Sequence, residues 1–235
     1  MNKIIKSTKS MGQSLWLDSI SREMINSGEI ENLINAGITG ITSNPTIFDK
    51  AIGESNVYDS ALIEYSKTSK TTEEIFEKLA TDDIKKAANL LRKTYQSSNF
   101  NDGYVSIEVS PQHADNSEAT IVQAERLWNK INEPNVMIKV PGTDEGFVAV
   151  KTLISKGINV NITLLFSVEQ YEKTAYAYLD GLTEFAKSGL GATNSVCSVA
   201  SFFISRIDTA VDNLLEKNSQ LKGKIGISNA KIAYD

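Results

Sequence analysis

The amino-acid sequence predicts an α/β protein with a parallel sheet, and two observations support this fold class. Short apolar or β-branched runs alternate with longer amphipathic stretches, which is the pattern of repeated strand–helix–strand units. Of the 235 residues, 41% are hydrophobic and 23% are charged, which is enough apolar material for one sizeable core. We therefore expect a globular protein in which residues 1–235 form a single domain.

Six strands are expected from the apolar runs. They are Ser14–Ser19, Gly37–Ser43, Tyr104–Val109, Val136–Pro141, Ile158–Phe166 and Val196–Phe202. Helices are expected at Arg22–Ala36, Thr72–Gln96, Ser117–Ile131, Glu145–Lys156, Val168–Lys187 and Phe203–Lys217. Gly37 and Gly157 are placed to end helices, and Ser167 is placed to begin one. The long stretch over residues 48–101 predicts extra helices inserted after the second strand.

Units of this kind form either an open doubly wound sheet or a (β/α)8 TIM barrel. No glycine-rich phosphate-binding segment follows the first strand, so nothing favours a nucleotide-binding sheet. Nearly every predicted strand carries an isolated polar residue near its C-terminal end or just beyond it. These residues are Asp18, Thr42 with Asn44, Glu108, Lys139, Asn161 with Thr163, and Ser201. In a barrel such positions converge on the mouth that holds the active site, so we predict a TIM barrel with one pocket there.

The charge and the rare residues exclude several classes of function. Lys and Arg number 24 against 29 Asp and Glu, and a net charge of −5 gives no global field for nucleic acid or anionic lipid. No run approaches the roughly 18 apolar residues of a membrane span, so we expect a cytoplasmic protein. The single cysteine, Cys197, and the single histidine, His113, cannot build a zinc site. We expect no metal, and we interpret His113 as a loop residue.

Three charged residues on otherwise apolar strands suggest a chemical role. Lys139 lies within VMIKVP, where an amine is expensive unless it faces water, as on an edge strand, or has a function. A desolvated amine on a central strand is a nucleophile toward carbonyl groups. Asp18 and Glu108 are either partners in ion pairs or proton carriers. Together the three would suffice to form an imine and to break a neighbouring carbon–carbon bond.

Two polar residues share one face of the fifth predicted strand. Asn161 and Thr163 are two positions apart, so their side chains point the same way. They are interpreted either as ordinary hydrogen-bonding groups inside a barrel or as groups that recognise substrate hydroxyls and orient a water molecule. The sequence pattern leaves both interpretations open.

Six segments of the chain resemble the transaldolase family in order and approximate spacing. They are LWLDSISR, GITGITSNPTIF, VSIEVSP, VMIKVPGTDEG, INVNITLLFS and SVASFFISRID. The resemblance runs from about Ser14 to the end of the chain and is greatest to the long form, which has extra helices after the second strand. It implies a TIM barrel of the class I aldolase type that needs no cofactor. The implied activity transfers a dihydroxyacetone unit between sugar phosphates in the pentose phosphate pathway.

The resemblance also implies a role for each matching residue. Lys139 is similar to the lysine that forms an imine with the donor ketose, and Asp18 to the acid/base of bond cleavage. Glu108, with Thr163, is similar to the pair that holds the catalytic water. The positions similar to the family's substrate-binding residues are Asn44, Thr42, Asn161, Ser201 and Arg206. Arg206 would hold the substrate phosphate, because a guanidinium can engage two of its oxygens.

The sequence differs from the family pattern in one respect. The family's last two strands have no counterpart in this sequence, whereas a closed barrel of this type needs eight, so we expect a fold truncated after about six strands. Sedoheptulose 7-phosphate or fructose 6-phosphate would be the donor, and glyceraldehyde 3-phosphate or erythrose 4-phosphate the acceptor. Two alternatives stay open: a class I aldolase that cleaves without transfer, and a non-catalytic remnant that binds sugar phosphate. The oligomeric state, monomer or homodimer, also stays open.

Overall fold

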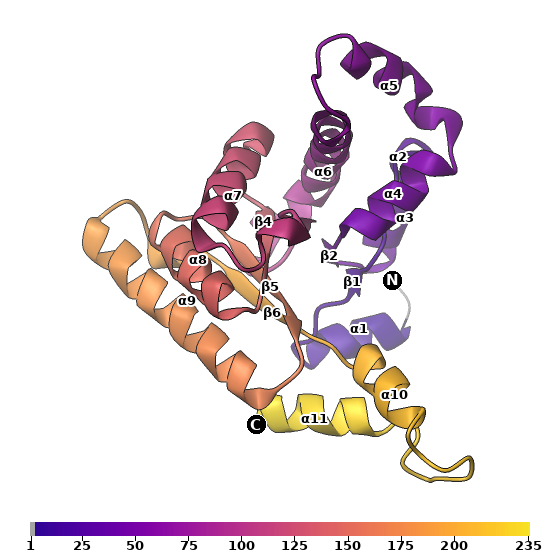
Figure 1. Ribbon diagram of the computed structural model, residues 1–235, viewed down its shortest axis with the longest axis vertical. Coiled ribbons are helices and arrows are strands. Elements are labelled where there is room, and N and C mark those ends of the chain that lie inside the picture. Colours follow the sequence, from indigo (N-terminus) through magenta and orange to yellow (C-terminus); the bar gives the residue numbers. More distant parts are fainter. Residues whose placement is uncertain (1–2) are drawn as a thin grey trace. The chain divides into compact units, whose positions relative to one another are not determined.

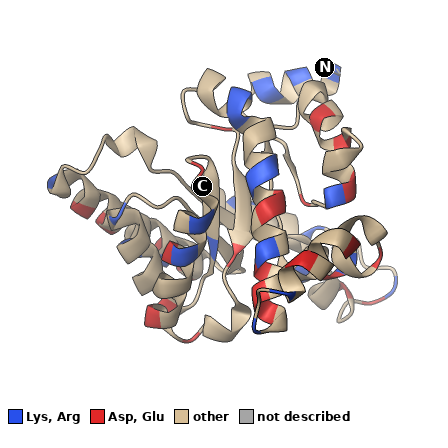
Figure 2. Cartoon of the chain, turned by 90° about the horizontal axis from the view of Figure 1, so that it is seen from above, with Lys and Arg blue, Asp and Glu red and all other residues tan. Residues whose placement is uncertain are grey.

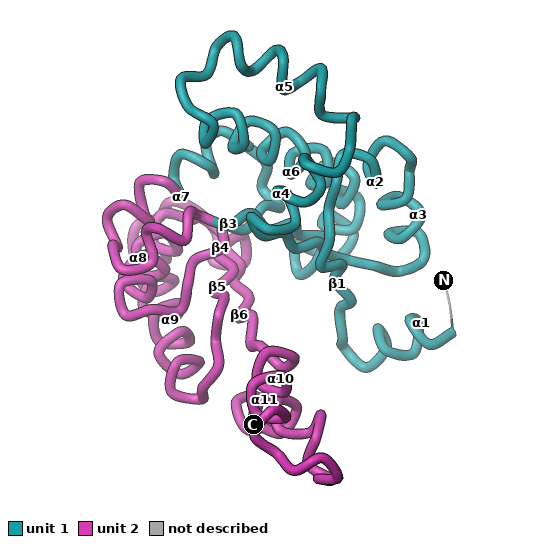
Figure 3. The backbone as a smooth tube through the Cα atoms, turned by 45° about the vertical axis from the view of Figure 1, so that its right-hand side comes forward, with its two compact units in different colours: residues 1–108, 124–138 teal, residues 109–123, 139–235 magenta. Residues whose placement is uncertain are grey.

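The structure of the protein is a computed structural model that describes residues 3–235. The chain divides into two compact units (Figure 3). Unit 1 comprises residues 1–108 and 124–138, and unit 2 comprises residues 109–123 and 139–235. The candidate residues are divided between the units, with Asp18 and Glu108 in unit 1 and Lys139 in unit 2.

Within residues 3–235, six parallel strands alternate with helices (Figure 1). The strands are β1 (Trp16–Leu17), β2 (Gly40–Ile41), β3 (Val105–Glu108), β4 (Val136–Pro141), β5 (Val160–Leu165) and β6 (Ser198–Phe202). Their hydrogen-bonded order, β1-β2-β3-β4-β5-β6, is the order of the chain. Sequential parallel strands separated by helices confirm the predicted fold class, a (β/α)8 type of barrel represented by six strands.

Most helices of unit 1 lie before β3. They are α1 (Lys3–Ser10), α2 (Arg22–Asn26), α3 (Glu29–Ala36), α4 (Pro45–Gly53), α5 (Asp59–Ser66) and α6 (Thr72–Ser97), with a short 3₁₀ turn, η1 (Asn56–Tyr58). Helix α6 turns Leu79, Ile84 and Leu91 into the core, where each is at most 1% exposed. The prediction of one helix over Arg22–Ala36 is wrong. Gly28, with φ of 78°, takes a left-handed conformation that separates α2 from α3.

Unit 2 contains the other helices, apart from α7 (Ser117–Ile131), which crosses from one unit to the other. They are α8 (Asp144–Ser155), α9 (Val168–Ser188), α10 (Ser205–Asp212) and α11 (Ile225–Tyr234), with 3₁₀ turns η2 (Pro111–His113) and η3 (Thr193–Ser195). Helices α8 and α9 pack closely because Gly181 has no side chain: a Cβ there would lie 2.6 Å from the carbonyl oxygen of Lys151. Ser167 caps α9 as predicted, accepting the N–H of Gln170.

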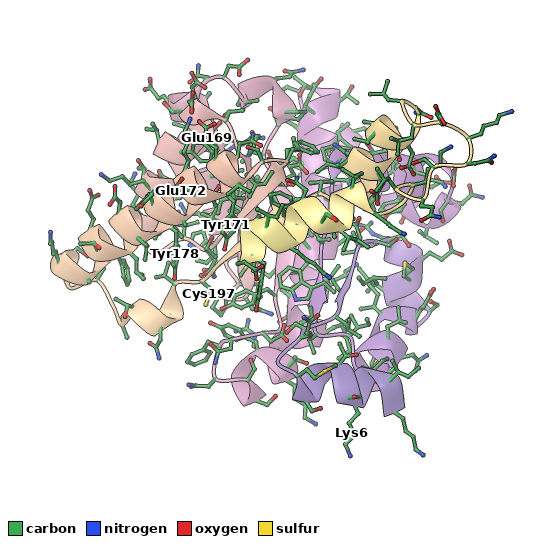
Figure 4. The ribbon with its side chains drawn as sticks, turned by 90° about the horizontal axis from the view of Figure 1, so that it is seen from below. Lys6, Glu169, Tyr171, Glu172, Tyr178 and Cys197 are labelled. Atoms are coloured by element: carbon green, nitrogen blue, oxygen red, sulfur yellow. The ribbon has the colours of Figure 1, made fainter. Side chains whose placement is uncertain are left out.

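The start of β6 is attached to its neighbours by two hydrogen bonds, which involve Tyr178 and Cys197. Both residues are labelled in Figure 4. Tyr178 of α9 donates its hydroxyl to the carbonyl of Val196 at 3.3 Å. The N–H of Cys197 donates to Oδ1 of Asn159 at 2.8 Å. Burial raises the pKa of the Tyr178 phenol, which keeps the donor protonated. The helix predicted to follow β6 over Phe203–Lys217 is shorter than expected, because α10 ends at Asp212.

Charged side chains of both signs are interspersed along the helices (Figure 2). Among residues 3–235, none of the helices has the length and apolar content needed to cross a membrane. Equally, the described part of the chain holds no group of three or more His, Cys, Asp or Glu side chains arranged to bind a metal ion.

Candidate active site

The candidate nucleophile, Lys139, lies in the middle of β4, where all six residues are buried. Its neighbours Ile138 and Val140 are fully buried, and Lys139 itself is 6% exposed. Its carbonyl accepts the N–H of Val109 at 3.2 Å, and β4 lies between β3 and β5 in the strand order. Lys139 therefore lies on a central strand. The alternative of an exposed lysine on an edge strand is wrong.

Two predicted binding residues of unit 2 contact one another directly. Asn161 of β5 is 1% exposed, and its Oδ1 accepts the hydroxyl of Ser201 from β6 at 2.7 Å. Both residues lie on strands that are in register, with Asn161 opposite Val199. The parallel ladder brings these side chains together, because residues two apart on a strand share a face. The Asn161 and Ser201 side chains are therefore adjacent on neighbouring strands.

Thr163 is followed by an irregularity in β5 that the sequence does not reveal. The pairing between β5 and β6 shifts between Ile162 and Leu165, and the intervening Leu164 has φ of 63°. A leucine in the left-handed region is strained, so the surrounding contacts must hold it there. One such contact joins the Thr163 carbonyl to the N–H of Gly142 at 2.8 Å. The bulge redirects the chain immediately after Thr163, which is itself 2% exposed.

Arg206 lies in a different environment from the other predicted residues of unit 2. It is exposed in the first turn of α10, and its guanidinium carbon lies 4.7 Å from the centre of the Phe203 ring. Stacking on an aromatic ring restrains the arginine while leaving its N–H groups in water. The side chain is therefore accessible to an anion.

In unit 1, Asp18 lies in the turn directly after β1 and is exposed. The preceding residue, Leu17, accepts the N–H of Thr42 at 2.8 Å, so the ends of β1 and β2 are joined there. Asn44 caps α4, with its Oδ1 accepting the N–H of Ile47 at 3.0 Å. This cap directs the amide of Asn44 toward the start of the helix. Asp18, Thr42 and Asn44 thus all follow the C-terminal ends of β1 and β2.

Glu108 is the last residue of β3 and is half-buried. Val109, which follows it in the chain, is the residue that donates its N–H to the Lys139 carbonyl. His113, expected in a loop, is instead the last residue of the 3₁₀ turn η2 and is half-buried. Ser43, which the sequence did not single out, is fully buried and donates its hydroxyl to the carbonyl of Ser106 at 2.7 Å.

Comparisons with known proteins assign the family. The sequence profile of the transaldolase/fructose-6-phosphate aldolase family matches residues 15–235. The chain belongs to this family. Among its relatives, a transaldolase of Trichodesmium erythraeum is 46% identical over 240 residues, and transaldolase 2 of Nostoc sp. is 46% identical over 241 residues. A transaldolase of Saccharopolyspora erythraea is 40% identical over 237 residues. The resemblance found in the sequence is thereby confirmed.

The matches cover nearly all of this chain but only part of each transaldolase. The Trichodesmium and Nostoc alignments include 96% of this chain and 63% of the relative, and the Saccharopolyspora alignment includes 99% and 64%. The chain therefore spans less than two thirds of the length of these transaldolases. All nine candidate residues lie inside the region matched by the family profile.

Proposed function

We propose that this protein is a transaldolase that acts through an imine on Lys139. It transfers a dihydroxyacetone unit from sedoheptulose 7-phosphate or fructose 6-phosphate to glyceraldehyde 3-phosphate or erythrose 4-phosphate. This reaction belongs to the non-oxidative pentose phosphate pathway of the cytoplasm. The observation that carries the proposal is a lysine at the centre of a fully buried strand in a chain of this family.

In the first half-reaction, the neutral amine of Lys139 attacks C2 of the donor ketose. The former carbonyl oxygen leaves as water, and a cationic imine remains. The carboxylate of Asp18 then takes the proton of the C4 hydroxyl. As C4 becomes the aldehyde of the departing aldose phosphate, the C3–C4 bond breaks and its electron pair moves into the imine, giving an enamine.

In the second half-reaction, C3 of the enamine attacks the aldehyde carbon of the acceptor. Asp18 returns the proton to the new hydroxyl group. Glu108 and Thr163 hold the water that hydrolyses the imine, which releases the ketose and restores the amine. Because the donor's aldose leaves before the acceptor binds, steady-state kinetics should be ping-pong.

The other polar candidate residues would bind the substrate. Asn161 and Ser201 contact one another and so could share the donor hydroxyls, while Asn44 and Thr42 follow β2 in unit 1. Arg206 is accessible and bears a forked donor group that suits a phosphate. The scheme uses side chains and water alone, and requires neither metal nor cofactor.

The proposed function is tested by product analysis with fructose 6-phosphate and erythrose 4-phosphate. The chain is assayed as it is and, in parallel, joined to the C-terminal portion of the Trichodesmium erythraeum transaldolase. A transaldolase forms sedoheptulose 7-phosphate and glyceraldehyde 3-phosphate in equal amounts. Free dihydroxyacetone would instead indicate an aldolase without transfer. Binding of fructose 6-phosphate without any product in either form would indicate a non-catalytic remnant and contradict the proposal.

A further inference from the structure

Unit 1 contains a buried charged cluster that the proposed reaction does not use. It consists of Arg22 at the start of α2, Tyr58 of η1 and Asp83 of α6, which are 7%, 0% and 0% exposed. We refer to these three residues as the Arg22 cluster. Its members are distant in sequence, so the fold brings them together.

Every member of the Arg22 cluster contacts both others. Arg22 donates from Nε to Oδ1 of Asp83 at 2.8 Å, and Tyr58 donates its hydroxyl to Oδ2 at 2.9 Å. The same hydroxyl accepts the backbone N–H of Arg22 at 2.8 Å. The Arg22 guanidinium also lies over the Tyr58 ring, 4.7 Å from its centre. The backbone and the side chain of Arg22 are therefore both held.

A buried charged cluster of this kind contributes little net free energy to the stability of a fold. Buried ion pairs lose much of their attraction to desolvation, and apolar residues of similar volume often stabilise a core better. Burial raises the pKa of the Asp83 carboxyl, and Nη2 of Arg22 is buried without a hydrogen bond among the described residues. Burial also raises the pKa of the Tyr58 phenol, which therefore stays a donor. Hydrogen bonds are directional, so the four contacts among these three residues favour one arrangement of them.

The position that the Arg22 cluster fixes is the end of the turn that carries Asp18. Arg22 is four residues after Asp18, and the intervening Ile20 is 1% exposed. Ser21 caps α2, with its side chain accepting the N–H of Met24 at 3.1 Å. At the other end of the turn, the Leu17 carbonyl is held by the N–H of Thr42. Asp18, although exposed, thus lies on a short segment attached at both ends.

We propose that Tyr58 and Asp83 are positioning residues, which hold Arg22 and thereby place the Asp18 carboxylate for carbon–carbon bond cleavage. This inference rests on the proposed function, because it gives Asp18 the acid/base role. It also assigns a purpose to η1 and α6, which follow β2: they supply the groups that anchor the turn after β1. A displacement of about 1 Å in such a group can reduce a rate about 100-fold.

The test compares Tyr58→Phe with Tyr65→Phe. Both substitutions remove a phenol hydroxyl that donates to an aspartate of α6, because Tyr65 of α5 donates to the neighbouring Asp82. Only the Tyr58 hydroxyl bonds to Arg22, although Oδ2 of Asp82, the acceptor of Tyr65, lies 3.9 Å from Nη2 of Arg22. Arg22→Lys serves as a second variant, since it keeps the charge but loses the planar guanidinium.

The first readout is the mobility of the turn, measured as backbone order parameters of Asp18, Ser19 and Ile20 by NMR. In the unsubstituted chain and in Tyr65→Phe we expect values near those of rigid backbone, about 0.85. In Tyr58→Phe and Arg22→Lys we expect them to fall below about 0.6. Unchanged order parameters in both variants would overturn the positioning role, whatever activity the protein has.

The second readout separates the steps of a single turnover with fructose 6-phosphate. We expect Tyr58→Phe to form the Lys139 imine normally, as trapped by borohydride, but to release aldose phosphate about 10- to 100-fold more slowly. In an Asp18→Asn background the same substitution should have no further effect on release. An equal loss of imine and release, or a further loss in that background, would indicate general destabilisation and overturn the proposal. An unsubstituted protein that forms no imine contradicts the proposed function instead.

Discussion

The turn after β1 in unit 1 and strand β5 in unit 2 both carry candidate site residues, but they are ordered in different ways. Asp18 is exposed in a turn that is held before it by the Leu17 carbonyl and after it by Arg22, whose contacts come from η1 and α6. Asn161 and Thr163 are 1% and 2% exposed within a strand whose partner is β6. A strand positions its side chains by its own hydrogen-bonded ladder, whereas a turn has no ladder and needs contacts from distant elements.

This difference separates two kinds of residue that a site requires. In β5 the candidate residues belong to the strand that orders them, and its ladder with β6 places Asn161 opposite Val199. In the turn after β1 the supports are Tyr58 and Asp83, which are 40 or more positions away from Asp18. Substitutions in the two regions should therefore alter activity and stability in different ways. The following predictions test that expectation in order of decreasing effect.

The largest effect is expected from removing a proton carrier. Asp18→Asn should reduce aldose phosphate release in a single turnover by about 10²–10⁴-fold while the donor imine accumulates, because the base for cleavage is lost. Glu108→Gln should instead slow imine formation and hydrolysis, because the Glu108 carboxylate holds the water molecule for these steps. Rapid-quench sampling with borohydride distinguishes the two patterns. Normal turnover by Glu108→Gln would show that Glu108 has a structural role.

A smaller but still large effect is expected from breaking the Arg22 cluster. Arg22→Met leaves the Asp83 carboxyl buried without its cation, which should lower the free energy of unfolding by about 3–5 kcal/mol. Urea unfolding monitored by circular dichroism measures this change. A loss below about 1 kcal/mol would mean that Asp83 is readily hydrated or protonated, and that the cluster holds the turn only weakly.

In unit 2 the corresponding substitution should have a milder effect. Ser201→Ala removes one hydroxyl that donates to Asn161 at 2.7 Å, and the net contribution of such a bond is about 1 kcal/mol. We expect a loss of that size in the free energy of unfolding and a rise of about five-fold in KM for the donor, with kcat little changed. A fall in kcat with unchanged KM would assign Ser201 to the chemistry rather than to binding.

The smallest effect concerns Tyr65. Its hydrogen bond to Asp82 raises the pKa of the phenol from 10.0 to about 12, so the folded state keeps a proton that the unfolded state loses. This stabilisation is complete below pH 10 and is lost as the pH rises to about 12. Over that interval the urea midpoint of Tyr65→Phe should fall less than that of the unsubstituted chain. If the urea midpoints of the two proteins fall equally between pH 10 and about 12, the pKa of Tyr65 is not raised.

Elements with strong local patterns are predictable from the sequence. The bounds of β4 and α7 are the same as those predicted, because a run of apolar β-branched residues and a regular amphipathic period leave little choice. Strands β1 and β2 have two residues each, whereas six and seven were predicted. Beyond them the two segments are joined by single backbone hydrogen bonds, such as the N–H of Thr39 to the Leu15 carbonyl at 2.9 Å, rather than by a longer ladder. The positions of residues on long central strands are thus the part of the candidate site that the sequence predicts best.

Features that depend on distant contacts could not be predicted. Nothing in LLF marks Leu164 as the residue with positive φ, because the bulge arises from the pairing of β5 with β6. Arg22 lies within a segment that the resemblance singles out, but its partner Asp83 stands in an ordinary stretch of charged helix. Sequence patterns identify groups that react, whereas the groups that hold them are visible only in the fold.

The central claim is that Lys139 forms the imine, and borohydride reduction in the presence of fructose 6-phosphate tests it most directly. Peptide mapping by mass spectrometry should place a three-carbon adduct on Lys139. The adduct should be absent from Lys139→Met but unchanged in Lys156→Met, a matched control at an exposed lysine just after α8. An adduct on another lysine, or one that persists in Lys139→Met, would contradict the account.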